Sequence, residues 1–498
     1  MHRRPGCVLL AACLTTFAAC ATPPGVVSTE ARSTPSTEPS PQLSTTSNPS
    51  TDSTQPTPST TPTDDNGIGD SLFPSLGNPG IDVQHYTLAL QYDALRNDLS
   101  GTVHLDVAMT DDRDEFSLDS DGPIVSKVLI DGQPAKFEAA DPELLITPNA
   151  RLSRGQHIAV DITYRVSPRP VKSQAGEEVG WFPTTAGAYV LDEPEGAHTW
   201  VPCDDHPSDK ATFRFDLHVD AGKTGVANGA LIDHTSSPGG DTWIWQEDQP
   251  TATYLVQLLI GDYTLVDGVG PDNLPLLSVV LQKDRTTMQP YLDTISDQID
   301  FFDDYFGPYP FDRYGIAITD SFEGLAMETT ERPTFSRADF ASGRLDSPQQ
   351  LFLSHELAHQ WFGDAVSPAR WKDIWLNESF ATYAEWMWLE HIGMGTVDSL
   401  ANAGLLGRIP GSTADPTVPE MFGYDSYEGG AVVLHALRKT IGDDLFFTLL
   451  RRWVADNKGS SRTTEDFVAL ANRVSGMDLT KFFATWLYAD TLPAAFPG

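Results

Sequence analysis

Residues 347–363 read SPQQLFLSHELAHQWFG, and this stretch decides the fold of the second half of the chain. Its Ser-Pro start and Gly end are typical of the two ends of a helix. In a helix, residues four apart lie one turn apart on the same face, so His355 and His359 can bind one metal ion. Glu356, next to the first histidine, can reach a water molecule on that ion. The stretch therefore predicts a helix with two ligands of a catalytic metal.

A third ligand follows after an interval of eighteen residues, at Glu378 in WKDIWLNESF (371–380). That interval is long enough to leave the first helix, form a loop and return on a second helix whose early residue faces the histidines. A catalytic zinc takes three protein ligands and keeps a fourth position open to water. His355, His359 and Glu378 therefore predict one zinc ion per chain.

The charge of the chain limits its partners. Its 498 residues include 69 Asp and Glu against 32 Lys and Arg, for a formal net charge of −37. Nucleic-acid binding needs clustered basic side chains, so we expect no nucleic-acid partner. Hydrophobic residues make up 40 % of the chain, which is enough for two or three packed domains. The four cysteines do not form a disulfide framework, because three of them lie within the first twenty residues.

Those first twenty residues, MHRRPGCVLLAACLTTFAAC, have the charged start, apolar stretch and small-residue end of an export signal. The apolar stretch is too short to remain as a membrane-spanning helix, which needs about 20 residues. We expect residues 1–19 to be a signal peptide, and Cys20 resembles the lipid-modified cysteine of bacterial lipoproteins. Cys13 is a second candidate, and ordinary cleavage near Ala21 would give a fully secreted protein. The leading expectation is a cell-surface lipoprotein, held to the outer face of the membrane only through Cys20.

Three segments of different composition follow the signal. Residues 20–70 are rich in Ser, Thr and Pro and hold few large apolar groups, which predicts a disordered stalk. Residues 80–267 alternate apolar and polar side chains, as in FRFDLHV (213–219), which predicts an antiparallel β-sandwich or saddle-shaped sheet. Residues 268–498 change to helical periodicity. The expected fold class is α+β multidomain, with an amino-terminal β domain followed by a mostly helical domain.

These motifs resemble those of the gluzincin aminopeptidases, peptidase family M1. The resemblance rests on HELAH (355–359), the interval of eighteen residues that follows it, and Asn377-Glu378. Three further stretches occur in the family's order: EPEGAHTWVPCDD (193–205), GLAMET (324–329) and YEGGAVVLH (427–435). It runs from about residue 81 to the end of the chain. The resemblance implies that residues 268–498 form a thermolysin-like zinc peptidase domain.

The resemblance also implies catalytic roles. Glu356 is the general base that takes a proton from the attacking water and passes it to the leaving amine. Tyr427 donates a hydrogen bond to the oxyanion that forms during attack. Tyr424, three residues earlier, is the rival for that role.

Substrate recognition is implied in the same way. The carboxylates of Glu328 and Glu193 bind the α-ammonium group, a contact that an acylated amine cannot make. Ala326 and Met327 belong to the segment that presents backbone to the substrate, as an edge strand does. The expected partners are therefore extracellular peptides with free amino termini.

Some positions depart from the family pattern. Thr329 stands where the family usually has Asn, Leu325 where it has Gly, and Leu191 where many members have Gln. Two other functions stay open beside the zinc aminopeptidase. One is a surface binding protein that kept the fold and lost turnover, and the other is a zinc endopeptidase.

Overall fold

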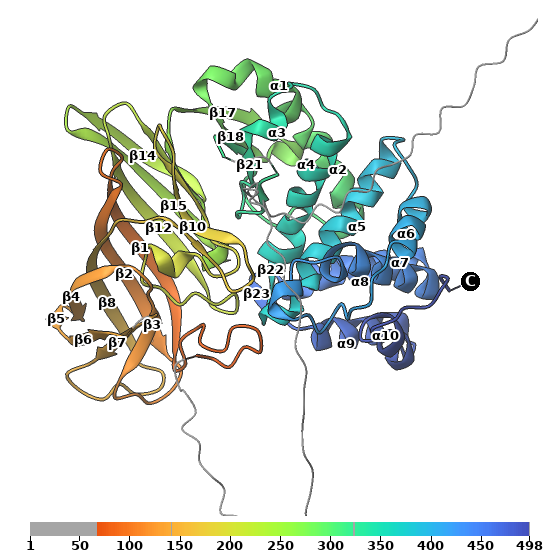
Figure 1. The fold of residues 1–498 in the computed structure, drawn as a ribbon, viewed down its shortest axis with the longest axis horizontal. Helices are drawn as coiled ribbons and strands as arrows, with labels where there is room; N and C mark the ends of the chain where they lie inside the picture. The colour runs from red at the N-terminus through yellow and green to blue at the C-terminus, as the bar shows by residue number, and fades with distance from the viewer. Residues whose placement is uncertain (1–66, 141, 322–323, 498) are drawn as a thin grey trace, which may run out of the picture.

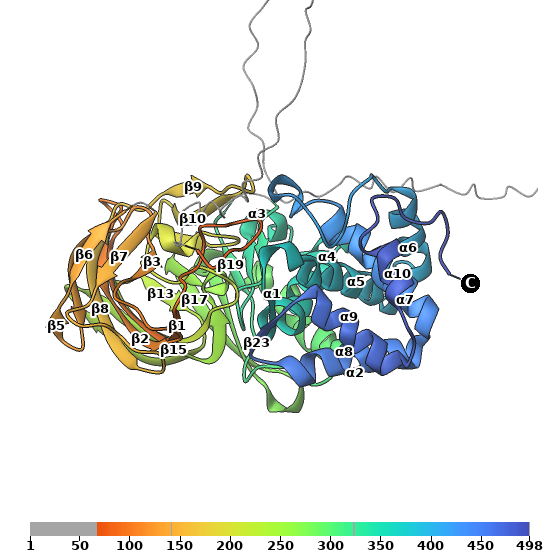
Figure 2. The same ribbon diagram turned by 90° about the horizontal axis from the view of Figure 1, so that it is seen from below.

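The computed structural model describes residues 67–140, 142–321 and 324–497. Its β-rich part and its helical part lie side by side, the first from the amino-terminal half and the second from the carboxyl-terminal half (Figure 1, Figure 2). This arrangement confirms the expected α+β fold. The signal peptide, Cys20 and the stalk up to residue 66 lie outside the described residues, so those expectations stay predictions.

An eight-stranded sheet is the main layer of the β domain. In order across the sheet, its strands are β14 (Ala230–Ser237), β15 (Gly240–Ala252), β12 (Lys210–Val219), β1 (Ile81–Asp93), β2 (Asp98–Met109), β8 (His157–Val166), β4 (Ile124–Ile130) and β5 (Gln133–Pro134). Neighbouring strands pair antiparallel, except that β1 pairs parallel with β12. The expectation of an antiparallel sheet is wrong at this pair, because alternation along a strand is the same for both directions of pairing.

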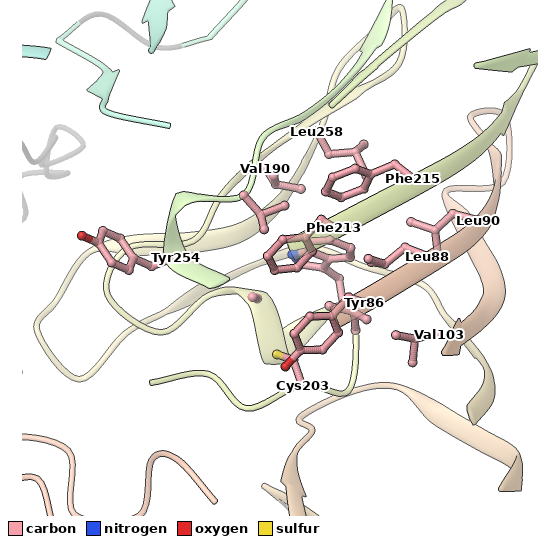
Figure 3. Close-up of a cluster of buried hydrophobic side chains, with 14 of the residues drawn as sticks. Tyr86, Leu88, Leu90, Val103, Val190, Cys203, Phe213, Phe215, Tyr254 and Leu258 are labelled. Atoms are coloured by element: carbon pink, nitrogen blue, oxygen red, sulfur yellow. The ribbon is translucent and has the colours of Figure 1, made fainter. Parts of the chain in front are cut away.

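Two smaller sheets complete this domain. One contains β13 (Thr224–Ala227), β16 (Leu258–Gly261), β11 (Ala188–Leu191), β10 (Glu178–Pro183) and β9 (Pro170–Lys172), and the other contains β3 (Phe116–Asp119), β7 (Glu143–Thr147) and β6 (Lys136–Ala139). The core holds many aromatic rings, and Tyr86 and Phe213 stack with centroids 4.9 Å apart (Figure 3). Cys203 lies in this core as a free, buried thiol.

A fourth sheet, of five strands, begins the second domain. Its order is β17 (Tyr263–Val269), β18 (Pro275–Leu281), β19 (Ala317–Thr319), β21 (Thr334–Ser336) and β20 (Ala326–Met327). β20 lies at the edge of this sheet and pairs only with β21 among the described strands. The expected domain boundary at residue 267 falls inside β17, so the catalytic domain starts a few residues earlier.

Helices pack around this sheet, with α1 above it and most of the others to its right and below it in Figure 1. They are α1 (Arg285–Asp293), α2 (Ile295–Phe306), α3 (Arg337–Phe340), α4 (Ser347–His359), α5 (Trp375–His391), α6 (Val397–Leu406), α7 (Gly430–Ile441), α8 (Asp443–Asn457), α9 (Thr464–Ser475) and α10 (Thr480–Trp486). A short pair, β22 (Val366–Pro368) and β23 (Ser460–Arg462), lies beside them. Within the described part of the chain, none of the helices has the length and apolar character needed to cross a membrane.

The segment before β1 joins the two domains. Asp70, expected to end the stalk, is buried instead, so the folded part includes it. Its carboxylate accepts a hydrogen bond from the backbone N–H of Trp371 at 2.8 Å and lies 3.2 Å from Nε2 of His206. Trp371 belongs to the catalytic domain and His206 to the β domain, so one carboxylate contacts both.

Candidate active site

Helices α4 and α5 bring the three expected metal ligands together. His355 and His359 lie one turn apart on α4, and Glu378 lies in the first turn of α5, which packs against α4. Oε2 of Glu378 is 3.2 Å from Nε2 of His355 and 3.5 Å from Nε2 of His359. One ligand atom from each of the three residues lies within 4.8 Å of the others. This arrangement can hold a single metal ion.

The other nitrogen of each histidine is also fixed. Nδ1 of His355 donates to Oε1 of Glu385 at 2.6 Å, and Nδ1 of His359 donates to the backbone oxygen of Phe362 at 3.1 Å. Carboxylate and carbonyl oxygens only accept, so each ring, once it is neutral as a metal ligand must be, keeps its proton on Nδ1 and its lone pair on Nε2. Two Nε2 lone pairs and a carboxylate are a donor set that suits zinc. The site therefore fits the expected zinc ion.

A turn after α4 supplies the Phe362 carbonyl. The α-helix ends at His359, before the expected end at Gly363, and a π-helical turn follows over Gln360–Asp364. Gly363 in this turn has φ +134°, which a residue with a Cβ atom rarely adopts. The change in direction points the Phe362 carbonyl back at the histidine ring.

Two carboxylates beside the ligand group have opposite pKa shifts. Burial raises the pKa of Glu356 to about 8, although the charges of His355 and His359 act against the shift. Burial acts in the same direction on Glu378, but His359 and His355 outweigh it and lower the pKa of that group to about 2. Glu378 is therefore an ionised ligand, whereas Glu356 can exchange a proton near neutral pH.

The structure separates the two candidate tyrosines. The ring of Tyr427 stacks on the ring of His355, with centroids 6.0 Å apart. The hydroxyl of Tyr424 instead donates to the backbone oxygen of Gly404 on α6. Burial and the Glu378 charge raise the pKa of Tyr427 well above its ordinary value, so its hydroxyl keeps its proton. Tyr427 is thus the tyrosine at the ligand group.

Glu328 and Glu193 approach the ligand group from two different segments. Glu328 follows β20, Glu193 follows β11, and carboxylate oxygens of both lie within 4.8 Å of Glu378. Among the described residues, Oε1 of Glu328 and Oε1 of Glu193 are buried and have no hydrogen-bond partner. Burial raises the pKa of both groups, and the charges of Glu328 and Glu378 add to the shift at Glu193. Burying two ionised carboxylates side by side costs free energy unless a cation lies beside them.

The strand before Glu328 is short. Ala326 pairs with Phe335 and Met327 with Thr334, and Met327 is buried whereas Ala326 is partly exposed. Of the departing positions, Leu325 and Leu191 are buried apolar residues, and the hydroxyl of Thr329 donates to the backbone oxygen of Arg332 at 2.7 Å.

Sequence reasoning missed Glu385 and Gln360. Glu385 lies seven residues after Glu378, two turns along the same helix face, so the spacing could have indicated it as the partner of a ligand. Gln360 directly follows His359, but its partners lie in a loop about thirty residues earlier, and no sequence pattern connects the two segments.

A β domain joined to a helical domain with a His-His-Glu group defines a class of zinc metallopeptidases. Residues 82–255 match the family model described as "Peptidase M1 N-terminal domain", and residues 291–486 match "Peptidase family M1 domain". The chain belongs to peptidase family M1.

Solved structures agree with this assignment. The M1 zinc metallopeptidase of Deinococcus radiodurans is 32 % identical, with a TM-score of 0.78 over 86 % of this chain and 99 % of that one. A structure from the same organism, bound to a Tyr-Ser-Ala substrate, is 30 % identical, with a TM-score of 0.77 and the same coverage. This similarity over nearly the whole solved chain confirms the two-domain M1 fold.

Curated relatives carry aminopeptidase names. "Probable aminopeptidase 1" of Sulfurisphaera tokodaii is 26 % identical, and "Leucyl aminopeptidase" of Saccharolobus solfataricus is 24 % identical. Both comparisons cover 83 % of this chain and 54 % of the relative. The chain thus spans about half the length of these curated relatives.

Proposed function

We propose that this M1 peptidase is a zinc aminopeptidase that releases single residues from the amino ends of peptides. One observation carries the proposal: the buried, unpartnered Oε1 atoms of Glu193 and Glu328 in the described structure, close to Glu378. A substrate α-ammonium would supply the missing positive charge and hydrogen-bond donors. The aminopeptidase names of the relatives support the same activity.

His355, His359 and Glu378 would hold the zinc ion. When bound, zinc lowers the pKa of water and polarises the scissile carbonyl. Glu385 and the Phe362 carbonyl orient the two imidazoles, so the chain presents the ligand atoms in place.

Glu356 is the proposed general base. Burial raises its pKa above the ordinary value of a carboxyl group, toward the neutral range, which suits a group that must both take and return a proton. Its carboxylate takes a proton from the attacking water and delivers it to the nitrogen of the leaving amine. The hydroxyl of Tyr427, which stays protonated, donates to the developing oxyanion, a contact typically worth about 3 kcal/mol.

The edge strand β20 is the proposed backbone contact. Its outer edge, which no described strand covers, can accept an extended peptide as an added strand, which would bring the substrate past Ala326 toward Glu328. The ammonium group would then lie between Glu328 and Glu193, and the first peptide bond would lie at the ligand group. An endopeptidase would require an open path beyond this carboxylate pair.

A panel of aminoacyl fluorogenic substrates tests the activity. We expect hydrolysis that a chelator abolishes and added zinc restores, with no hydrolysis of the N-acetylated forms. Cleavage of blocked peptides at internal bonds would identify an endopeptidase instead. A zinc-loaded protein that turns over no substrate of the panel would indicate the silent binding protein.

We further propose that the protein is exported and anchored through Cys20. The sequence of residues 1–20 supports this proposal, since it ends in small residues and a cysteine after an apolar stretch. Metabolic labelling with a fatty-acid analogue tests it. Label in the wild type and in Cys13→Ser, but not in Cys20→Ser, is expected. Unlabelled protein in the medium would show ordinary secretion.

A further inference from the structure

The side chain of Gln360 joins the zinc-ligand helix to the loop that carries Glu328. Gln360 is fully buried directly after His359. Its Oε1 accepts from the backbone N–H of Glu331 at 2.8 Å and from the hydroxyl of Tyr309 at 3.3 Å. Its Nε2 donates to the backbone oxygen of Glu328 at 3.3 Å. A single amide therefore contacts both ends of the segment 328–331.

This segment adopts a backbone conformation that needs support. Glu331 has φ +65°, in the left-handed region that a residue with a Cβ atom occupies only at a cost. Its N–H bonds to Gln360 and its buried carboxylate pairs with Arg313 at 3.2 Å. The bond to Gln360 is thus the backbone contact of the strained residue, beside the contacts of its carboxylate.

A second glutamine holds the other end of the loop. Nε2 of Gln257, from the β domain, donates to the backbone oxygen of Arg332 at 2.6 Å and to Oγ1 of Thr334 at 2.8 Å. The side chain of Arg332 returns a hydrogen bond to Oε1 of Gln257 at 3.0 Å. Nε2 of Gln257 also donates to Oγ1 of Thr329 at 3.1 Å, and Nδ2 of Asn228 donates to the backbone oxygen of Thr330 at 3.2 Å. The β domain therefore holds the middle of the loop and the part after Glu331, whereas Gln360 holds the carbonyl of Glu328 and the N–H of Glu331.

We infer that Gln360 is a positioning residue that sets the separation between the Glu328 carboxylate and the metal ligands. Within the described structure, Oε1 of Glu328 has no hydrogen-bond partner, so its position follows that of the Glu328 backbone, whose carbonyl oxygen accepts from Gln360. That separation decides how far the substrate amine lies from the bond that is cut. The inference rests on the proposed aminopeptidase function. It assigns Gln360 a role in setting the cut one residue from the amino end of the peptide.

Two ligands that differ only in the amine test the inference. L-leucine hydroxamate and its deamino analogue, 4-methylpentanohydroxamate, are titrated by calorimetry into the zinc-loaded protein. Wild type should prefer the amine-bearing ligand. Gln360→Leu should reduce this preference about tenfold, as expected for loss of an aligned charge-assisted contact, while affinity for the deamino analogue changes less than twofold.

Gln350→Leu is the matched control. Gln350 is a second buried glutamine, within α4, and it accepts from Nε1 of Trp388 at 2.7 Å, away from the Glu328 loop. Its variant should keep the wild-type preference. Gln360→Glu keeps the oxygen that accepts from Glu331 and loses the N–H that donates to Glu328. If the leucine variant unfolds, this variant tests whether the preference for the amine-bearing ligand depends on Gln360.

Three results would overturn the inference. Equal weakening of both ligands in the Gln360 variants would show a general structural role. An unchanged preference in variants that bind zinc and melt like the control would show that Gln360 does not position Glu328. No preference in the wild type would remove the amine-binding role of Glu328 itself, and the proposed function would fail together with the inference.

Discussion

The site has two halves that differ in their hydrogen bonding: the metal half, with His355, His359 and Glu378, and the amine half, with Glu193 and Glu328. In the metal half, each histidine ligand has a hydrogen-bond partner at Nδ1. In the amine half, each carboxylate has a buried oxygen without a hydrogen-bond partner among the described residues. Ligand orientation in the metal half is set by the protein alone. We propose that the amine half is electrostatically complete only when a cation is present, and we therefore expect it to select substrates by charge.

The largest effect is expected where the two halves meet. A Glu356 oxygen lies within 4.8 Å of ligand atoms of both Glu328 and His359, and Glu356→Gln removes the proposed base. We expect kcat to fall by about 10³-fold or more, with zinc content unchanged. Steady-state kinetics and metal analysis measure both, with the exposed Glu138→Gln as control. A loss of less than tenfold would remove Glu356 from the role of base.

Tyr427→Phe tests whether the metal half also stabilises the transition state. We expect kcat to fall about 100-fold with little change in KM, because the lost hydrogen bond forms only to the oxyanion. Tyr424→Phe should lower kcat less than threefold, since the hydroxyl of Tyr424 is bonded to Gly404. The reverse order of these two losses would assign the role to Tyr424.

Glu328→Gln removes charge from the amine half alone. We expect kcat/KM for free-amine substrates to fall up to about 100-fold, because a charge-assisted hydrogen bond becomes a neutral one. Zinc affinity should stay at the wild-type value, and zinc competition with a fluorescent chelator measures it. A parallel loss of zinc would show that the two halves are not separate.

Glu385→Gln weakens the metal half alone. The amide oxygen can still accept from Nδ1 of His355, but the neutral group supports the imidazole less strongly, so we expect zinc affinity to fall about tenfold. At saturating zinc, the preference for free-amine substrates should be unchanged. Unaltered zinc affinity would contradict the role of Glu385 as a ligand partner.

The smallest effect on catalysis is expected outside both halves, at Asp70. Burial opposes ionisation there, but the hydrogen bonds from His206 and Trp371 lower the pKa of Asp70 to about 2. A lowered pKa stabilises the folded state above the ordinary value of 3.8, and this contribution disappears as the pH falls through about 2. Asp70→Asn should therefore lower the free energy of unfolding by about 2 kcal/mol at pH 7.

Denaturant unfolding at a series of pH values measures this prediction. The difference between wild type and Asp70→Asn should shrink as the solution is acidified below pH 4, while the exposed control Asp267→Asn shows no difference at pH 7. Both variants should keep wild-type kcat at pH 7. A difference that grows with acid would contradict the assigned direction of the shift.

The comparison of the two halves also explains what the sequence could predict. The metal half rests on local spacing, because a helix fixes the relation of residues four apart, and a short interval returns the third ligand. Glu193 and Glu328 come from segments far from the metal ligands in the sequence, so only the family resemblance indicated them. Gln360 directly follows His359, but its partners lie in distant segments, so nothing in the sequence indicated its role. Similarly, alternation predicted the β domain but could not indicate that β1 pairs parallel with β12.

The most direct test of the central claim is mass spectrometry of two peptides with the same sequence, one with a free amino end and one N-acetylated, after incubation with the zinc-loaded protein. We predict that the free peptide loses one residue at a time from its amino end, that the acetylated peptide stays intact, and that Glu356→Gln cleaves neither. Internal cleavage of the acetylated peptide, or no cleavage of either peptide by wild type, would contradict the claim that the amine half defines an aminopeptidase.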